Sequence, residues 1–167
     1  MSRNFYFDCS SGISGDMTVA ALLDLGADRE VLEKMIASLQ KQGIEGFQVK
    51  ISRVKKSGMD ACDFSVLLDE IHENHDHDMA WLHGKQPIEN NGETVHLHHV
   101  HHTHRPLSDI LHIIDHADMT QNARKLAVRM FTILAEAEAK AHGVKPDEVH
   151  FHEVGAVDSI VDILSVA

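Results

Sequence analysis

Histidine is concentrated in one internal stretch of the chain, at a spacing that could serve metal capture. The 167 residues include 15 histidines, of which a dense group is formed by His96, His98, His99, His101, His102 and His104. Imidazole ligands favour late first-row divalent ions, with nickel and copper ahead of iron and manganese. The group is internal and is interrupted by Leu97, Val100 and Thr103, unlike a purification tag. The pattern predicts a loop that captures transition metals, with a solvated polar loop as the alternative.

A second group of candidate ligands lies near the end of the sequence. In an extended segment His150 and His152 point to one side and Phe151 points to the other, toward the core. Glu153 follows, and beyond it Asp158 and Asp162 share one face of a predicted helix. Carboxylates beside imidazoles can bind a metal, orient its ligands or accept protons. Ordinary polar strand residues and a carboxylate in a helix first turn explain the same pattern equally well.

A third candidate site is the segment DCSSGISGDM near the start of the chain. A strand, a turn and a helix N-terminus would present backbone N–H groups to a phosphate. The Gly-Lys-Ser/Thr ending of a Walker sequence is absent, and acidic side chains suit a metal ion or a cationic ring better than a bare phosphate. Turn and capping chemistry alone is the alternative. The candidate cofactor-binding residues are Asp8, Ser11, Gly12, Ser14, Gly15 and Asp16.

The elements that must position these groups are predicted from hydrophobic periodicity. In residues 1–71 we expect a short buried strand over Phe5–Asp8, a helix from Ser14 to about Leu25 and a second from about Asp28 to Gly43. Alternation around 47–52 and 62–68 predicts a hairpin, with Cys62 buried. Periodicity is lost over 72–105, which we interpret as a disordered metal-binding loop.

Residues 106–167 continue the same domain with a helical segment and the HFHE motif. We expect a helix after Pro106, a longer one from Thr120 to Gly143, an extended piece over Val149–Glu153 and a last helix from about Val157. The order of elements favours an α+β or irregular α/β fold, in which helices pack on a small mixed sheet that is incomplete without a C-terminal half.

Composition excludes several classes of function. The net charge is −11, from 15 basic and 26 acidic residues, so binding to nucleic acid lacks its electrostatic drive. No apolar run of about 18 residues is present, so we expect a soluble cytoplasmic protein. Two cysteines are too few for a disulfide framework. His112, His116 and His142 have sufficient explanations as exposed or helix-end residues and are not assigned to a site.

Three segments together resemble the N-terminal half of the LarC family of nickel insertion proteins. They are DCSSGISGDM from Asp8 to Met17, the histidine-rich loop, and HFHEVGAVDSIVDI from His150 to Ile163. The resemblance covers essentially the whole chain in the same order. It implies a nickel chelatase, a CTP-dependent cyclometallase, which inserts Ni(II) into pyridinium-3,5-bisthiocarboxylic acid mononucleotide. The product would be the nickel-pincer nucleotide cofactor of lactate racemase.

The resemblance also implies roles and partners. The histidine loop would collect nickel, the turn at 11–15 would hold the substrate phosphate, and CTP with its divalent metal would bind the C-terminal half or a separate subunit. Apo lactate racemase would be an indirect partner, and a homo-oligomer is compatible with the sequence. The residues expected to hold the ion or accept the proton lost from pyridinium C4 are His150, His152, Glu153 and Asp158. Apolar residues expected to dock on the C-terminal half are Ile160, Ile163, Leu164 and Val166.

Two other functions compete with nickel insertion. A nickel or zinc storage or metallochaperone module without chemistry would need only the histidine loop. A metal-dependent hydrolase would use His150, His152, Asp8 and Asp16, but the chain has no assembled hydrolytic signature. The motifs DCSSGISGDM and HFHEVGAVDSIVDI, the two end motifs of the chain, favour insertion over storage. Storage of a metal ion would not require them.

Overall fold

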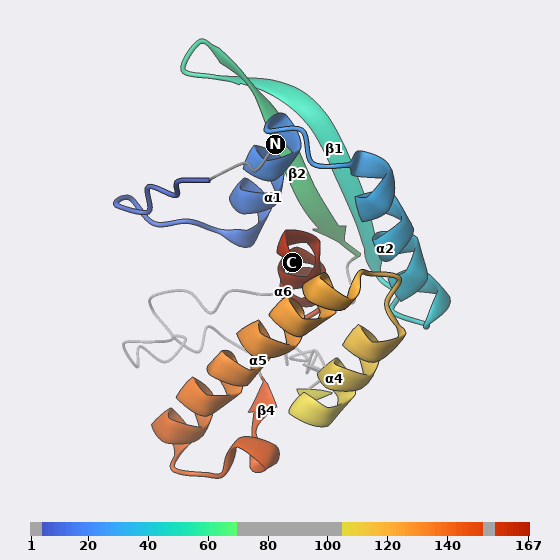
Figure 1. Cartoon of the computed structure of the whole chain (residues 1–167), viewed down its shortest axis with the longest axis vertical. Coiled ribbons are helices and arrows are strands. Elements are labelled where there is room, and N and C mark those ends of the chain that lie inside the picture. The colour runs from blue at the N-terminus through green and yellow to red at the C-terminus, as the bar shows by residue number, and fades with distance from the viewer. Residues whose placement is uncertain (1–4, 70–104, 152–155) are drawn as a thin grey trace, which may run out of the picture.

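The computed structural model describes residues 5–69, 105–151 and 156–167 (Figure 1). The helices are α1 (Gly15–Asp24), α2 (Arg29–Lys41), α4 (Leu107–His116), α5 (Gln121–His142), the short 3-10 helix η1 (Pro146–Glu148) and α6 (Val157–Val166). The strands are β1 (Phe47–Lys56), β2 (Met59–Leu68), β3 (Arg105–Pro106) and β4 (His150–Phe151). The α+β class is confirmed, and the strands form two antiparallel pairs, β1 with β2 and β3 with β4. Residues 72–104 of the predicted loop lie outside the described residues.

Helix α2 follows its sequence signals closely. The carboxylate of Asp28 caps it by accepting a hydrogen bond from the backbone N–H of Glu30 at 2.9 Å. Four apolar residues spaced at i, i+3, i+4 and i+7 are buried: Leu32, Met35, Ile36 and Leu39. The chain leaves the helix through Gly43 with a positive φ of 81°. The predicted amphipathic helix is thereby confirmed.

The predicted hairpin is also confirmed. Its register runs from Phe47 opposite Leu68 to Lys56 opposite Met59. Ser57 and Gly58 both have positive φ, as a two-residue turn between twisted strands requires. Cys62 is only half-buried and packs at the edge of the core, so its predicted burial is correct only in part.

Helix α1 is fastened to this hairpin at its C-terminal end. The carboxylate of Asp24 accepts a hydrogen bond from the backbone N–H of Cys62 at 2.8 Å and another from the guanidinium of Arg53. These donors hold the pKa of Asp24 below its ordinary value, the backbone N–H having the larger effect. With its last turn anchored in this way, α1 presents its N-terminus toward α6.

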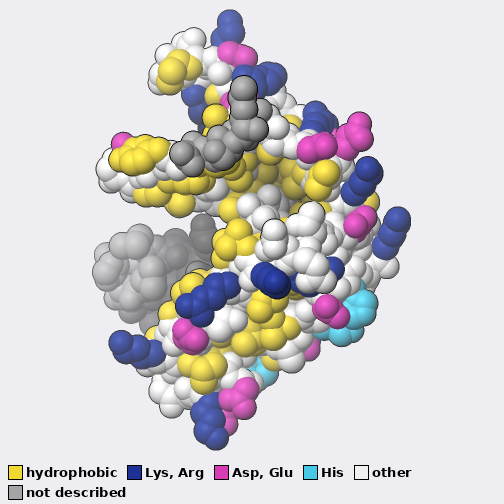
Figure 2. All heavy atoms as spheres, in the orientation of Figure 1, with side chains coloured by type: hydrophobic (Ala, Val, Ile, Leu, Met, Phe, Trp, Pro, Cys, Tyr) yellow, Lys and Arg dark blue, Asp and Glu magenta, His cyan; other side chains and the backbone are white. Residues whose placement is uncertain are grey.

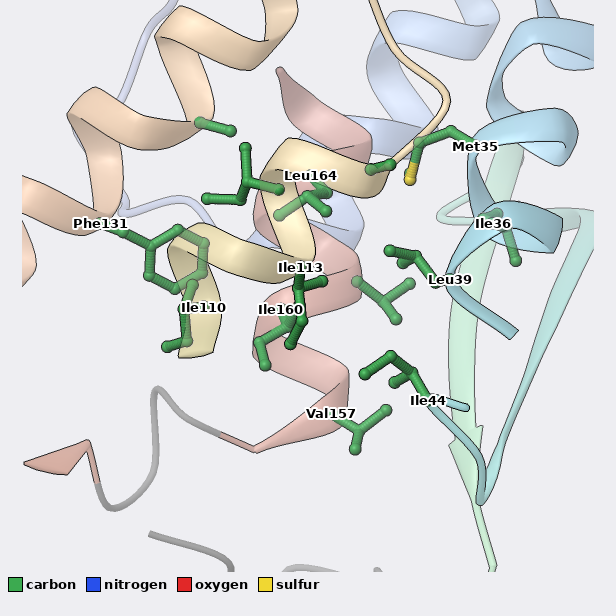
Figure 3. Packing of buried hydrophobic residues seen from close by; sticks show 14 of the residues in the cluster. Met35, Ile36, Leu39, Ile44, Ile110, Ile113, Phe131, Val157, Ile160 and Leu164 are labelled. Carbon is green, nitrogen blue, oxygen red and sulfur yellow. The ribbon is translucent and has the colours of Figure 1, made fainter. Parts of the chain in front are cut away.

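Helix α6 is the central element of the core. It contacts α1, α2, α5 and β2, and Figure 1 shows it between these elements. Ile160 is fully buried and Leu164 is 2% exposed. Figure 3 shows both among side chains from α2, α4 and α5. The expectation that these two residues dock on a missing half is therefore wrong, because the described chain itself encloses them.

Helices α4 and α5 form the other side of the core. The hydroxyl of Thr120 caps α5 by accepting a hydrogen bond from the backbone N–H of Ala123 at 3.2 Å, and Gly143 ends the helix in the left-handed conformation. Arg124 donates to the carbonyl oxygen of Ala117 at 3.0 Å and so ties the start of α5 to the end of α4. Both predicted helix boundaries are confirmed. Within the described part of the chain, no helix has the length and apolar character needed to cross a membrane.

The predicted buried strand over 5–8 is wrong. These residues have no regular secondary structure, and Tyr6 is 92% exposed. The described strands pair only with one another, so this run has no described partner. Alternation over four residues is a weak signal, because a strand needs a neighbour as well as a pattern.

Candidate functional site

The DCSSGISGDM segment begins as an exposed turn held by short-range hydrogen bonds. Asp8 accepts a hydrogen bond from the backbone N–H of Ser10 at 3.0 Å, and Gly12 donates to the carbonyl oxygen of Cys9 at 3.0 Å. Hydrogen bonds from Ser10 keep the pKa of Asp8 below its ordinary value. Gly12 has φ 81°, a conformation that glycine adopts without strain. The turn therefore exposes its polar groups, and Ser11 is among them.

The segment then enters α1, where the backbone N–H groups of Asp16 and Met17 already have acceptors. Ser14 occupies the N-cap position, but its hydroxyl donates to the carboxylate of Asp16. The same carboxylate accepts from the backbone N–H of Met17 at 2.7 Å. The backbone N–H of Asp16 donates to the carboxylate of Asp162 on α6. Carboxylates of the protein thus occupy part of the helix N-terminus that the sequence suggested for a phosphate.

Gly15 is where the two end motifs meet. A Cβ atom at this position would lie 2.6 Å from Oδ2 of Asp162 and 2.7 Å from its Cβ. No larger residue fits without moving α1 away from α6. The glycine of the first motif is therefore required by a carboxylate of the second.

Asp162 is the most perturbed carboxyl group in the described residues. Burial, together with the negative charges of Asp16 and Asp158, raises its pKa to about 6, and the hydrogen bond from the backbone N–H of Asp16 opposes the shift. Its Oδ1 atom is buried and has no hydrogen-bond partner in the described part of the chain. A carboxyl that exchanges its proton close to neutral pH is suited to general acid–base chemistry.

Sequence reasoning assigned Asp158 to the site and left Asp162 out. The available signal was the i, i+4 spacing of the two residues, which places them on one helix face. Asp158 accepts a hydrogen bond from the backbone N–H of Ser159 at 2.8 Å, within its own helical turn. The partner that perturbs Asp162, the N-terminus of α1, comes from the opposite end of the sequence, so the spacing could not reveal it.

The second histidine motif is fixed by the pairing of β3 with β4. Arg105 lies opposite Phe151, and Pro106 lies opposite His150. His150 is exposed, whereas Phe151 is fully buried with its ring centroid 6.2 Å from that of Phe131. The predicted alternation of a polar and a core-facing residue is confirmed for these two positions.

The predicted metal ligands can be placed only in part. Six loop residues and two residues of the HFHE motif lie outside the described residues: His96, His98, His99, His101, His102, His104, His152 and Glu153. Among the residues that are described, no three His, Cys, Asp or Glu side chains are grouped so that they could hold a metal ion. The arrangement brings together Gly15, Asp16, Asp158 and Asp162, whereas Asp8, Ser11 and Gly12 belong to the exposed turn.

Two further histidines stack on α4 outside this arrangement. The rings of His112 and His116 have centroids 4.2 Å apart, and Nδ1 of His116 lies 2.9 Å from the carbonyl oxygen of His112. His142 lies 3.1 Å from the carboxylate of Glu138. All three are exposed, in agreement with their interpretation as exposed or helix-end residues.

Comparison with known proteins defines the class. The family model described as nickel insertion protein matches residues 5–167, and the chain belongs to this family. The expected resemblance to nickel insertion proteins is thus confirmed. No solved structure matches the chain.

Individual relatives carry a more specific name, pyridinium-3,5-bisthiocarboxylic acid mononucleotide nickel insertion protein. A relative from Alkaliphilus metalliredigens (strain QYMF) is 48% identical over 100% of this chain and 36% of its own length. One from Akkermansia muciniphila is 39% identical over 99% of this chain and 35% of its own length. One from Geobacillus kaustophilus (strain HTA426) is 39% identical over 97% and 34%. The chain therefore spans about a third of the length of these relatives.

Proposed function

We propose that this chain binds Ni(II) and takes part in its insertion into pyridinium-3,5-bisthiocarboxylic acid mononucleotide. Together with the C-terminal part of the longer protein, or a separate subunit, it would act as a nickel chelatase. The observation that carries the proposal is the junction of the two end motifs, where Gly15 adjoins a carboxyl with a pKa of about 6. The names of the relatives supply the substrate class.

The proposed reaction needs a proton acceptor. Nickel forms one bond to pyridinium C4 and two bonds to the thiocarboxylate sulfurs, and the electron pair of the C4–H bond becomes the nickel–carbon bond. The proton of C4 must leave. Asp162 has the pKa expected of a base that accepts it near neutral pH, because burial and then the charges of Asp16 and Asp158 favour its protonated form. We assign Asp162 as this base, with Asp158 beside it.

Nickel is the substrate ion, and histidines are its proposed carriers. The group from His96 to His104 would collect it, and His150, His152 and Glu153 would hold it for insertion. The pairing of Arg105 with Phe151 supports a transfer of nickel from the first group to the second. In the sequence Arg105 directly follows His104, and Phe151 lies between His150 and His152. CTP with its divalent metal would bind the C-terminal part, and a cytoplasmic location would suit delivery of the product to apo lactate racemase.

The nucleotide phosphate is assigned to the exposed turn. Ser11 and Gly12 are exposed, whereas the N–H groups of Asp16 and Met17 in the first turn of α1 already bond to carboxylates. The phosphate would therefore contact the turn rather than the helix end. Asp8, Ser14, Gly15 and Asp16 would shape the path from this turn toward Asp162.

The test is reconstitution of racemase activation. The chain is mixed with the C-terminal part of the Alkaliphilus relative, CTP, Ni(II) and the thiocarboxylated nucleotide, and activation of apo lactate racemase is measured. We expect activation, and a loss of at least about 100-fold for Asp162→Asn, since a lost general base has an effect of this size. Asp115→Asn, at an exposed carboxylate on α4, is the matched control. Full activity of Asp162→Asn would exclude the assigned base.

Storage or delivery of nickel or zinc without chemistry is the second candidate, favoured by the histidine group itself. Replacing the six histidines from His96 to His104 by alanine should remove most bound nickel in equilibrium dialysis, while the exposed His112, His116 and His142 serve as the control set. Affinity should fall toward pH 5, because protonated imidazole cannot bind a metal. Normal nickel binding with no activation in the reconstituted mixture would leave storage as the function.

A further inference from the structure

An apolar groove opens beside the C-terminal end of α6. Its volume is about 330 Å³, and α1, α2, the start of α5 and α6 all contribute to its walls. Leu22 and Leu23 come from α1, Val31 from α2, Met119 from the segment before α5, and Val166 and Ala167 from the end of α6. Figure 2 shows hydrophobic side chains gathered on this face of the molecule.

The walls of the groove are incompletely covered. Val31 is 50% exposed, and Leu22, Leu23 and Met119 are each only half-buried. Leu32 and Met35 also line the groove but are buried. The groove thus continues the hydrophobic core out to the surface and leaves apolar area in contact with water.

The last residues of α6 are still helical. The backbone N–H of Ala167 donates to the carbonyl oxygen of Ile163 at 3.2 Å, an i to i−4 hydrogen bond. The last turn contains neither a basic residue nor a glycine. One more turn along the same axis would advance about 5.4 Å. Because Val166 and Ala167 already form part of the groove wall, that turn would start inside the groove.

We propose that this groove is the docking surface for the polypeptide that follows the Ala167 position in the longer relatives, which enters it as a direct continuation of α6. The relatives are about three times as long as the matched region, so they have chain available to fill it. The occupant would be helical and would turn apolar side chains, three or four residues apart, toward Leu23, Val31 and Met119. The inference is independent of nickel chemistry.

The test compares the chain alone with a chimera in which it is continued from Ala167 by the remainder of the Alkaliphilus relative. Hydrogen exchange of backbone amides at 29–35 and 119–123 should be at least about tenfold slower in the chimera, because a filled groove opens less often. Exchange in the hairpin turn at Ser57 and Gly58, which do not line the groove, is the internal reference. Equal exchange in both proteins would overturn the proposal.

A pair of substitutions at similar exposure makes the test specific. Val31→Asp should lower the melting temperature of the chimera by about 3 °C and that of the chain alone by much less, since the carboxylate reaches water only when the groove is open. Leu126→Asp is the control, because Leu126 is 47% exposed on α5 and does not line the groove. Equal effects of Val31→Asp in the two proteins would contradict the proposal. So would a dimer of the chain alone that Val31→Asp dissociates, which would assign the groove to a second copy.

Discussion

The two motif-bearing regions of the molecule are held in place in different ways. Residues 5–14 are exposed, with Phe5 and Phe7 each 53% accessible and Tyr6 almost fully so, and the hydrogen bonds described for them are short-range. Helix α6 lies at the centre, where Ile160 and Val161 are fully buried. One region carries polar groups on a loosely packed turn, and the other carries them on the most enclosed helix.

Because of this difference, effects of substitutions on function can be distinguished from their effects on the free energy of unfolding. Substitutions on α6 that reach the core change the free energy of unfolding, whatever they do to function. Side-chain substitutions in 5–14 away from Gly12 should leave that free energy nearly unchanged, so a loss of activity there would report on binding or catalysis. Gly15 and Asp162 join the two regions and should show both effects.

The largest loss of stability is expected from truncation of a buried side chain of α6. Ile160→Ala should lower the free energy of unfolding by about 3 kcal/mol, because it leaves a cavity among α2, α4 and α5. Tyr6→Ala should change it by less than about 0.5 kcal/mol. Urea denaturation followed by circular dichroism measures both values. Similar losses for the two variants would mean that residues 5–14 pack as firmly as α6.

The next largest loss of stability is expected where Gly15 of α1 packs against Asp162 of α6. Gly15→Ala should cost about 2 kcal/mol, because its Cβ would meet the Cβ of Asp162 as well as a carboxylate oxygen. Gly12→Ala meets no atom within 4 Å and should cost at most about 1 kcal/mol, from its positive φ. The same denaturation experiment ranks the two. A reversed order would show that α1 can move away from α6 at little cost.

Local pattern predicted most of the helices and the hairpin. The buried stripe of α2, the Thr120 cap of α5 and the hairpin around Gly58 depend on neighbours in the sequence, and the structure has them as expected. The strand over 5–8 failed because a strand depends on a partner. The burial of Ile160 was also missed, since the end of a sequence looks unpartnered until its helix is placed in three dimensions.

Some residues of the candidate site could be predicted from the sequence, but the contact that brings them together could not. Asp16 and Asp158 stood out in their own motifs, whereas Asp162 acquires its perturbed pKa from burial and from a charge on α1. That contact joins opposite ends of the sequence. No spacing rule connects them, so only the packing of α1 on α6 shows that Gly15 and Asp162 form one unit.

Asp162→Asn is expected to raise the free energy of unfolding, by less than the two preceding substitutions lower it. The folded-state pKa of Asp162 is raised to about 6 from 3.8, so the folded chain holds this proton more tightly than the unfolded chain. The resulting stability is present below about pH 4 and is lost as the pH rises through 6. At pH 8 the uncharged Asn should therefore stabilise the fold by about 1 kcal/mol, after allowance for the partial exposure of the group.

Thermal unfolding at pH 4 and pH 8 measures this difference. The gain should vanish at pH 4, where both side chains are neutral, and it should accompany the loss of activation described above. Asp115→Asn, at a carboxylate that is 75% exposed, is the matched control for the substitution itself. A destabilised Asp162→Asn variant at pH 8 would mean that the carboxylate is favourably bound rather than strained.

The smallest effect on stability is expected in the exposed turn that contains Asp8. Asp8 and Asp162 are both carboxylates of end motifs, yet hydrogen bonds from Ser10 lower the pKa of Asp8 below 3.8 whereas burial raises that of Asp162 to about 6. A carbon-detected NMR titration of the two carboxyl groups should find them in that order. Asp8→Asn should leave the melting temperature within about 1 °C of the parent at pH 7, because the turn carries little of the fold. If Asp8 instead titrated above 3.8, its hydrogen bonds with Ser10 would be absent in solution, and the turn would offer a phosphate no preformed surface.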